Sequence, residues 1–137
     1  MEFKITSRKI IILVICIVIV GAIYVGFNQF YKEKNALKII SMDLMRSEEG
    51  LNFTATVKIQ NTGSNDISNA ELHLIFIKDN DIADTNIQSL NLQSNKVSTY
   101  RANFIDVSFE IENTYKAIAS IYLENECLDT KTITKQF

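Results

Sequence analysis

The sequence offers few residues that could support catalysis. His73 is the only histidine, and it stands two positions after Glu71, so the two side chains share one phase of a strand. A hydrolytic triad would need a nucleophile turn of the G-x-S-x-G kind, and that pattern does not occur. The glycines are too scattered to form a loop that cradles phosphate. We therefore predict a protein that is not an enzyme, with no cofactor and no small-molecule substrate, in which His73 is structural.

An acidic segment is the one candidate for binding a metal ion. Asp79, Asp81 and Asp84 are closely spaced, and hard cations such as Ca²⁺ need several such oxygen ligands. The segment lacks the sixth-position glycine and the distal glutamate of an EF-hand loop. A solvated turn explains the same residues, so we expect no metal and keep the three aspartates as candidates.

The two cysteines and one sequon are the remaining reactive features. Cys16 lies in an apolar run and Cys127 in the last expected strand, so the two should not pair. Cys127 is expected to be a buried thiol, with an intermolecular disulfide as the alternative. Asn52-Phe53-Thr54 is an N-glycosylation sequon, and Asn52 falls on the solvent-facing phase of its strand, which makes it a glycosylation candidate.

A long apolar segment near the N-terminus predicts a membrane helix. No charged residue occurs from Ile10 to Phe27, and the segment from Ile10 to Tyr31 would span about 33 Å as a helix, close to the ~30 Å bilayer core. A cleaved signal peptide is the alternative, with Val20-Gly21-Ala22 as the cleavage triplet. The apolar run continues past that triplet, which favours an uncleaved single-pass anchor (a signal-anchor).

Charge indicates how the chain is oriented. Residues 1–38 have a net charge of +4, whereas residues 39–137 have eight basic and fourteen acidic side chains, a net of −6. An acidic domain beyond an N-terminal anchor is typical of an outward-facing layout, and its charge would repel nucleic acid. The expected parts are a cytoplasmic N-terminus (1–9), a transmembrane helix (10–31), a short juxtamembrane linker (32–36) and an extracytoplasmic domain (37–137) at the cell membrane.

The residues after the anchor alternate as β-strands do. Leu51 to Ile59 place apolar and polar residues at strict period two, which predicts a strand with one face in a core. Similar segments recur every 8–12 residues, so the domain is predicted to be all-β, an antiparallel immunoglobulin-like sandwich of seven to eight strands. A small barrel is the competing architecture. The expected strands cover residues 37–45, 51–59, 70–78, 86–92, 97–104, 106–112, 115–123 and 127–135.

Four large side chains fall on the outward phase of their strands. Ile75 and Ile77 belong to one strand, and Ile118 and Tyr122 to another. Exposed together, they would form a docking face for a protein partner. Burial under a neighbouring strand or the second sheet is the alternative.

One segment resembles a known family. Val57-Lys58-Ile59-Gln60-Asn61-Thr62-Gly63 is similar to the V-x-V-x-N-x-G strand and turn of CARDB-like immunoglobulin-fold modules, and Ser89 to Thr99 is similar to a second segment without its proline and glycine. The resemblance implies an adhesion, spacer or presentation domain like those on archaeal and bacterial cell surfaces. We expect a membrane-anchored, non-catalytic module for protein–protein or envelope interaction; the alternative is an accessory or structural subunit of a membrane complex or surface filament, stator-like, assembled through its helix.

Overall fold

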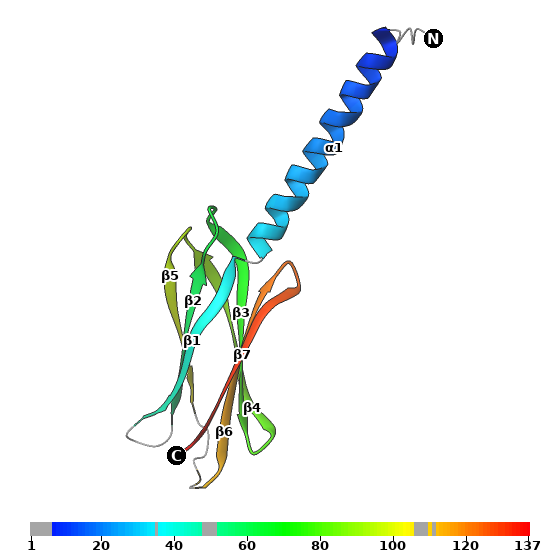
Figure 1. Ribbon diagram of the computed structural model, residues 1–137. Helices are drawn as coiled ribbons and strands as arrows, with labels where there is room; N and C mark the ends of the chain where they lie inside the picture. The colour runs from blue at the N-terminus through cyan, green and yellow to red at the C-terminus, as the bar shows by residue number, and fades with distance from the viewer. Residues whose placement is uncertain (1–6, 35, 48–51, 106–109, 111) are drawn as a thin grey trace. The chain divides into compact units, whose positions relative to one another are not determined.

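The computed structural model describes residues 7–34, 36–47, 52–105, 110 and 112–137, which form one helix and seven strands (Figure 1). The chain divides into two compact units, Met1–Glu33 and Lys34–Phe137. The helix α1 spans Ser7–Lys34, and all of it except Lys34 belongs to the first unit. It therefore continues three residues into the segment expected to be a linker, because nothing in Tyr31-Lys32-Glu33-Lys34 breaks a helix.

The second unit is a sandwich of two antiparallel sheets. One sheet has the strand order β1-β2-β5 and the other β4-β3-β6-β7. The chain crosses between the sheets after β2, β4 and β5, so the pairs β2-β5 and β3-β6 join strands that are not consecutive, as in Greek-key folds. This confirms the all-β sandwich and not the barrel. The strands are β1 (Leu37–Arg46), β2 (Phe53–Asn61), β3 (Ile67–Lys78), β4 (Asp81–Leu92), β5 (Val97–Phe104), β6 (Thr114–Leu123) and β7 (Glu126–Gln136).

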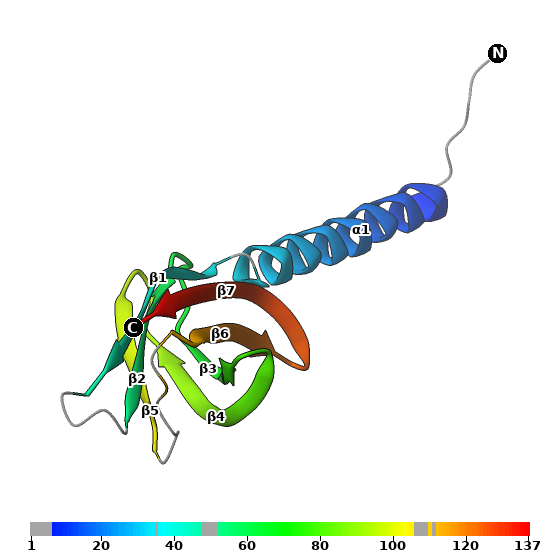
Figure 2. The same ribbon diagram turned by 90° about the horizontal axis from the view of Figure 1, so that it is seen from below.

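The core lies between the two sheets, and its centre is aromatic. The alternation predicted for β2 is present from Phe53 to Ile59, where every second residue is fully buried. Phe53 stacks on Tyr115 with 4.7 Å between ring centroids, and Phe76 stacks on Phe104 at 4.9 Å. Figure 2 looks along the sandwich and shows the two sheets on either side of this core. Burial of rings of this size is a large share of the hydrophobic stabilisation.

Two tight hairpins fix the register of the four-stranded sheet. Asp79 and Asn80 join β3 to β4, and Glu124 and Asn125 join β6 to β7, all with φ between 48° and 73°. Positive φ at both central residues is the type I′ arrangement, whose twist matches that of the flanking strands. Asn and Asp tolerate this region better than other non-glycine residues, which explains turns without glycine.

Two expected strands differ from the structure. β4 begins at Asp81, five residues before the predicted start, because a bulge near Ala83 shifts the phase and hides the alternation in the sequence. The strand expected over 106–112 falls mostly outside the described residues.

Candidate interaction surface

The helix α1 has the length and composition to cross a membrane. Its stretch Ile11–Asn28 has a mean hydropathy of 2.7, and none of that stretch is buried inside the structure. Apolar side chains such as Val20 and Phe27 are 65% and 70% exposed. A helix that is apolar on every side and uncovered by protein suits a lipid surround. An N-terminal signal sequence meets the same criteria, so the structure shows a helix fit to be an anchor or a signal segment.

A second apolar surface lies on the side of the four-stranded sheet that faces away from the core. Ile75 on β3 is directly opposite Ile118 on β6, and Ile77 and Tyr122 lie on the same face further along these two strands. All four are half-buried, and neither the second sheet nor a neighbouring strand covers them. We call this surface the outer isoleucine face, defined by six side chains: Ile75, Ile77, Ile82, Ile87, Ile118 and Tyr122.

The strand β4 extends this face in a way that the sequence did not reveal. Ile82 is opposite Ile77, and Ile87 is opposite His73. Ile82 and Ile87 are 65% and 62% exposed. Their contribution was missed because the bulge in β4 disguises which of its residues share a face. The four predicted residues, which are half-buried, are thus part of a larger and partly exposed apolar surface.

His73 lies within this face and makes two contacts. Its Nε2 is 3.0 Å from Glu71 Oε2, and its ring centroid is 4.5 Å from that of Tyr122. Ser120 is the cross-strand neighbour of His73, but its hydroxyl is 3.0 Å from that of Thr130. Within the part of the chain that the structure describes, no nucleophilic side chain is hydrogen-bonded to the imidazole. The histidine therefore orders a patch of the sheet surface rather than forming a recognisable catalytic pair.

The three aspartates of the acidic segment are placed on different structures. Asp79 is in the β3–β4 turn, where its Oδ1 accepts a hydrogen bond from the backbone N–H of Thr114 at 3.2 Å. Asp81 and Asp84 lie in β4, and Asp84 Oδ1 accepts from the N–H of Thr85 at 2.7 Å. Among the residues described, no three His, Cys, Asp or Glu side chains come together as metal ligands. The segment closes a hairpin and does not gather carboxylates at one point.

The prediction that Cys127 is a buried thiol is wrong. Its side chain is exposed, not buried, and its Sγ lies 3.3 Å from Thr130 Oγ1. The reason is a bulge between Ile121 and Tyr122 on the paired strands, which puts Cys127 opposite Tyr122 on the outer side of the sheet. Cys16 is also exposed, on α1.

The asparagine of the predicted glycosylation sequon is only partly accessible to solvent. Asn52 precedes β2 and is half-buried, and its backbone N–H donates to Ser47 Oγ at 3.3 Å. The hydroxyl of Thr54 donates to Asn103 Oδ1 at 2.9 Å on the outer face of the other sheet. Glycosylation of Asn52 stays a prediction.

The N-x-G motif forms a clamp at the end of β2. Asn61 is fully buried, and its Nδ2 donates to the carbonyls of Asn65 at 2.9 Å and Leu92 at 3.1 Å. Its Oδ1 accepts from the N–H of Gly63 at 2.9 Å. A Cβ on Gly63 would lie 3.0 Å from the Ala36 Cβ, which explains why glycine occupies that position. The motif is therefore structural. It links β2 of one sheet to β4 of the other, and it lies against Ala36 at the start of the domain.

A second structural bond was not foreseen from the sequence. The hydroxyl of the buried Tyr115 accepts from the backbone N–H of Glu110 at 2.9 Å and donates to the carbonyl of the same residue at 3.2 Å. A tyrosine that bonds back to the chain a few residues upstream is the tyrosine corner of immunoglobulin-like sandwiches. The alternating pattern identified Tyr115 as a core residue but gave no signal for its hydroxyl.

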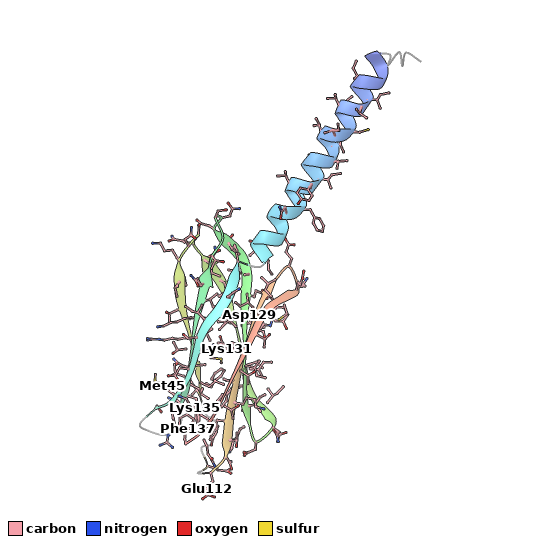
Figure 3. The ribbon with its side chains drawn as sticks, in the orientation of Figure 1. Met45, Glu112, Asp129, Lys131, Lys135 and Phe137 are labelled. Atoms are coloured by element: carbon pink, nitrogen blue, oxygen red, sulfur yellow. The ribbon has the colours of Figure 1, made fainter. Side chains whose placement is uncertain are left out.

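The free edges of the four-stranded sheet are protected. Figure 3 shows Asp129, Lys131 and Lys135 of β7 along the neighbouring β1. Asp129 Oδ2 accepts from the N–H of Ile39 at 2.8 Å, and Lys135 Nζ lies 2.6 Å from Asp43 Oδ1. This bond to Lys135 is the main reason that the pKa of Asp43 lies below its usual value. At the opposite edge, the bulge and the aspartates of β4 discourage strand addition.

The three-stranded sheet has a different outer face. Its outward positions include Thr54, Thr56, Lys58, Arg101 and Asn103, which alternate with the buried residues of β2 and β5. This surface is mainly polar, and Met45 and Val97 are the exposed apolar side chains at its ends. A row of opposed isoleucines is found only on the outer face of the four-stranded sheet among the residues described.

Comparisons with known proteins support the fold and leave the function open. No protein-family model matches the chain, and no curated protein does. A glycosyl hydrolase family 2 member from Bacteroides cellulosilyticus is similar in structure, with a TM-score of 0.61, 10% identity, and coverage of 74% of this chain and 15% of that chain. The β-glucuronidase of Bacteroides uniformis is also similar, with a TM-score of 0.57 and 14% identity, and the match covers 74% of this chain and 13% of that chain.

These likenesses concern a single module of much larger proteins. The β-glucuronidase of Parabacteroides merdae, at a TM-score of 0.51 and 11% identity, is likewise covered over only 14% of its length. At such identities the shared property is the β-sandwich fold. No catalytic property passes from those proteins to this chain, and the CARDB-like family stays a prediction.

Proposed function

We propose that this protein is a membrane-anchored β-sandwich module that faces away from the cytoplasm and works through protein–protein or cell-envelope contact, without catalysis. The observation that carries the proposal is the presence of two apolar surfaces in one chain that are not covered by protein. One is the helix α1, which suits lipid, and the other is the outer isoleucine face, which suits a protein surface. The CARDB-like resemblance around Asn61 and Gly63 agrees with a cell-surface role of this kind.

The alternative is an accessory or structural subunit, stator-like, whose helix is itself an assembly element. One observation favours it: a shallow, open hollow lies along one side of α1. Small side chains at Cys16 and Gly21 open this hollow, and a neighbouring helix could pack closely there.

Purification of the full-length chain from its native membrane after cross-linking tests both proposals. Ile75→Glu disrupts the sheet surface, and Gly21→Ile fills the hollow on the helix. A module that binds through its sandwich loses its partner with Ile75→Glu and keeps it with Gly21→Ile. A subunit assembled through its helix gives the reverse pattern. Extraction of the wild-type chain by alkaline carbonate would contradict membrane anchoring in either form.

Absence of catalysis is tested separately. If His73→Ala removed a hydrolytic activity measured on the wild-type domain, the non-catalytic proposal would be wrong. We expect no turnover in either protein, because His73 is hydrogen-bonded to Glu71 and lies against Tyr122, and no nucleophilic side chain among the described residues is hydrogen-bonded to it.

A further inference from the structure

The outer isoleucine face has the properties of the inside of a sandwich. Along β3 and β6 its central residues, Ile75 and Ile118, are β-branched and directly opposed. On β7 the matching position is Thr132, which is also β-branched. Sheet faces rich in β-branched residues pack against another sheet about 10 Å away in β-sandwiches. The composition of this surface therefore suits a second sheet.

Charge on this face permits the same surface to meet itself. Among the outward positions that pair across the four strands, only Glu71 and Lys116 are charged. The net charge of −6 on residues 39–137 is carried elsewhere, for example on Asp66, Asp79 and Glu124 in the turns. Two copies can thus approach through this face without net repulsion at the contact.

The size of the face predicts a weak contact. Four strands about 4.8 Å apart, over a length of about 20 Å, give a projected area of roughly 400 Å². Two such faces would bury roughly 800 Å² in total, below the roughly 1,000 Å² expected of a specific interface between freely diffusing proteins. A contact of this size forms readily only where the partners are held at high local concentration, and two copies anchored in one bilayer meet that condition.

We propose that the outer isoleucine face binds the same face of a second copy in the membrane, with Ile75 and Ile118 at the centre of a two-fold interface. The occupant is a second copy because this chain supplies all three requirements: a sheet face with an apolar, β-branched centre, a near-neutral contact and a tether that raises local concentration. This inference rests on the proposed membrane anchoring and adds the identity of the partner.

Disulfide cross-linking of the full-length chain in proteoliposomes tests the inference. In a Cys16→Ser, Cys127→Ser background, Ile118→Cys places one thiol near the expected two-fold axis. Thr56→Cys is the matched control, because Thr56 lies on the outer face of the other sheet. At high lipid-to-protein ratio we expect Ile118→Cys to form a dimer on oxidation and Thr56→Cys to remain monomeric. Equal yields from the two, or no dimer from either, would overturn the proposal.

A second substitution tests the interface itself. In the Ile118→Cys chain, Ile75→Glu places a carboxylate at the centre of the contact, and we expect the dimer yield to fall roughly tenfold or more. Thr56→Glu in the same chain should leave the yield unchanged. An unchanged yield with Ile75→Glu in a folded domain, as judged by circular dichroism, would show that the face is not the interface. Carbonate extraction of the same liposomes reports on anchoring alone, so failure of the proposed function is distinguishable from failure of this inference.

Discussion

Replacing Asn61 with alanine should destabilise the sandwich more than any other single polar change on β2. The side chain is fully buried and makes three hydrogen bonds to backbone groups. Each such bond contributes about 1 kcal/mol net, so the loss is about 3 kcal/mol. That is a large fraction of the roughly 5–15 kcal/mol by which a domain is stable. For a domain of this size, the melting temperature should fall by roughly 12–24 °C.

The measurement is urea unfolding of a protein comprising residues 34–137, monitored by circular dichroism. Gln60→Ala is the matched control, because Gln60 is the preceding residue on β2 and lies on the outer side. Its effect should stay within about 0.5 kcal/mol, as is usual for surface changes. The midpoint for Asn61→Ala should shift without a change in slope, since the slope reports the surface exposed on unfolding.

A further variant separates the hydrogen bonds from the shape of the side chain. Asn61→Asp keeps the shape and the acceptor for Gly63, but sets a carboxylate against the carbonyls of Asn65 and Leu92. It should be at least as destabilising as alanine at neutral pH, and partly recover when protonation restores a donor. A loss below about 1 kcal/mol for both variants would refute the assignment of the N-x-G motif as a buried clamp.

Three other perturbations follow from the packing. Gly63→Ala should cost roughly 1–3 kcal/mol in thermal or urea unfolding, because the new methyl group would lie 3.0 Å from the Ala36 Cβ. Tyr115→Phe should cost about 1–2 kcal/mol by the same assay, since both bonds of its hydroxyl are lost, and a neutral result would exclude a tyrosine corner. The lowered pKa of Asp43 stabilises the fold above pH about 4, and this contribution is lost as the pH falls through the folded pKa. Lys135→Met should therefore weaken the acid dependence between pH 5 and 2, and an unchanged profile would contradict the bond.

The helix and the inward faces of the strands could be predicted from the sequence, because burial selects apolar residues in a regular pattern. The alternation from Phe53 to Ile59 survives in the structure, since every inward residue of β2 meets the core. The uncharged run after Ile10 likewise predicts the helix. In both cases one physical property, the transfer of apolar surface out of water, decides the structure.

Prediction fails where a bulge or a backbone bond decides the outcome. A bulge near Ala83 reverses the phase of β4, so Ile82 and Ile87 could not be assigned to the docking face from periodicity. Another bulge turns Cys127 outward. The bond of the Tyr115 hydroxyl depends on a residue pairing that no local pattern encodes. Bulges and hydrogen bonds to individual backbone groups therefore cannot be predicted from the alternation of apolar and polar residues.

The central claim, an anchored chain with its sandwich outside the cytoplasm, is tested most directly by labelling Cys127 in intact cells. The thiol is exposed on the domain, whereas Cys16 lies in the apolar helix. A membrane-impermeant maleimide should label the wild-type chain in unbroken cells and fail to label Cys127→Ser, and the labelled chain should stay in the membrane after carbonate treatment. Labelling of Cys127 only after cell lysis, or release of the labelled chain by carbonate, would contradict the account.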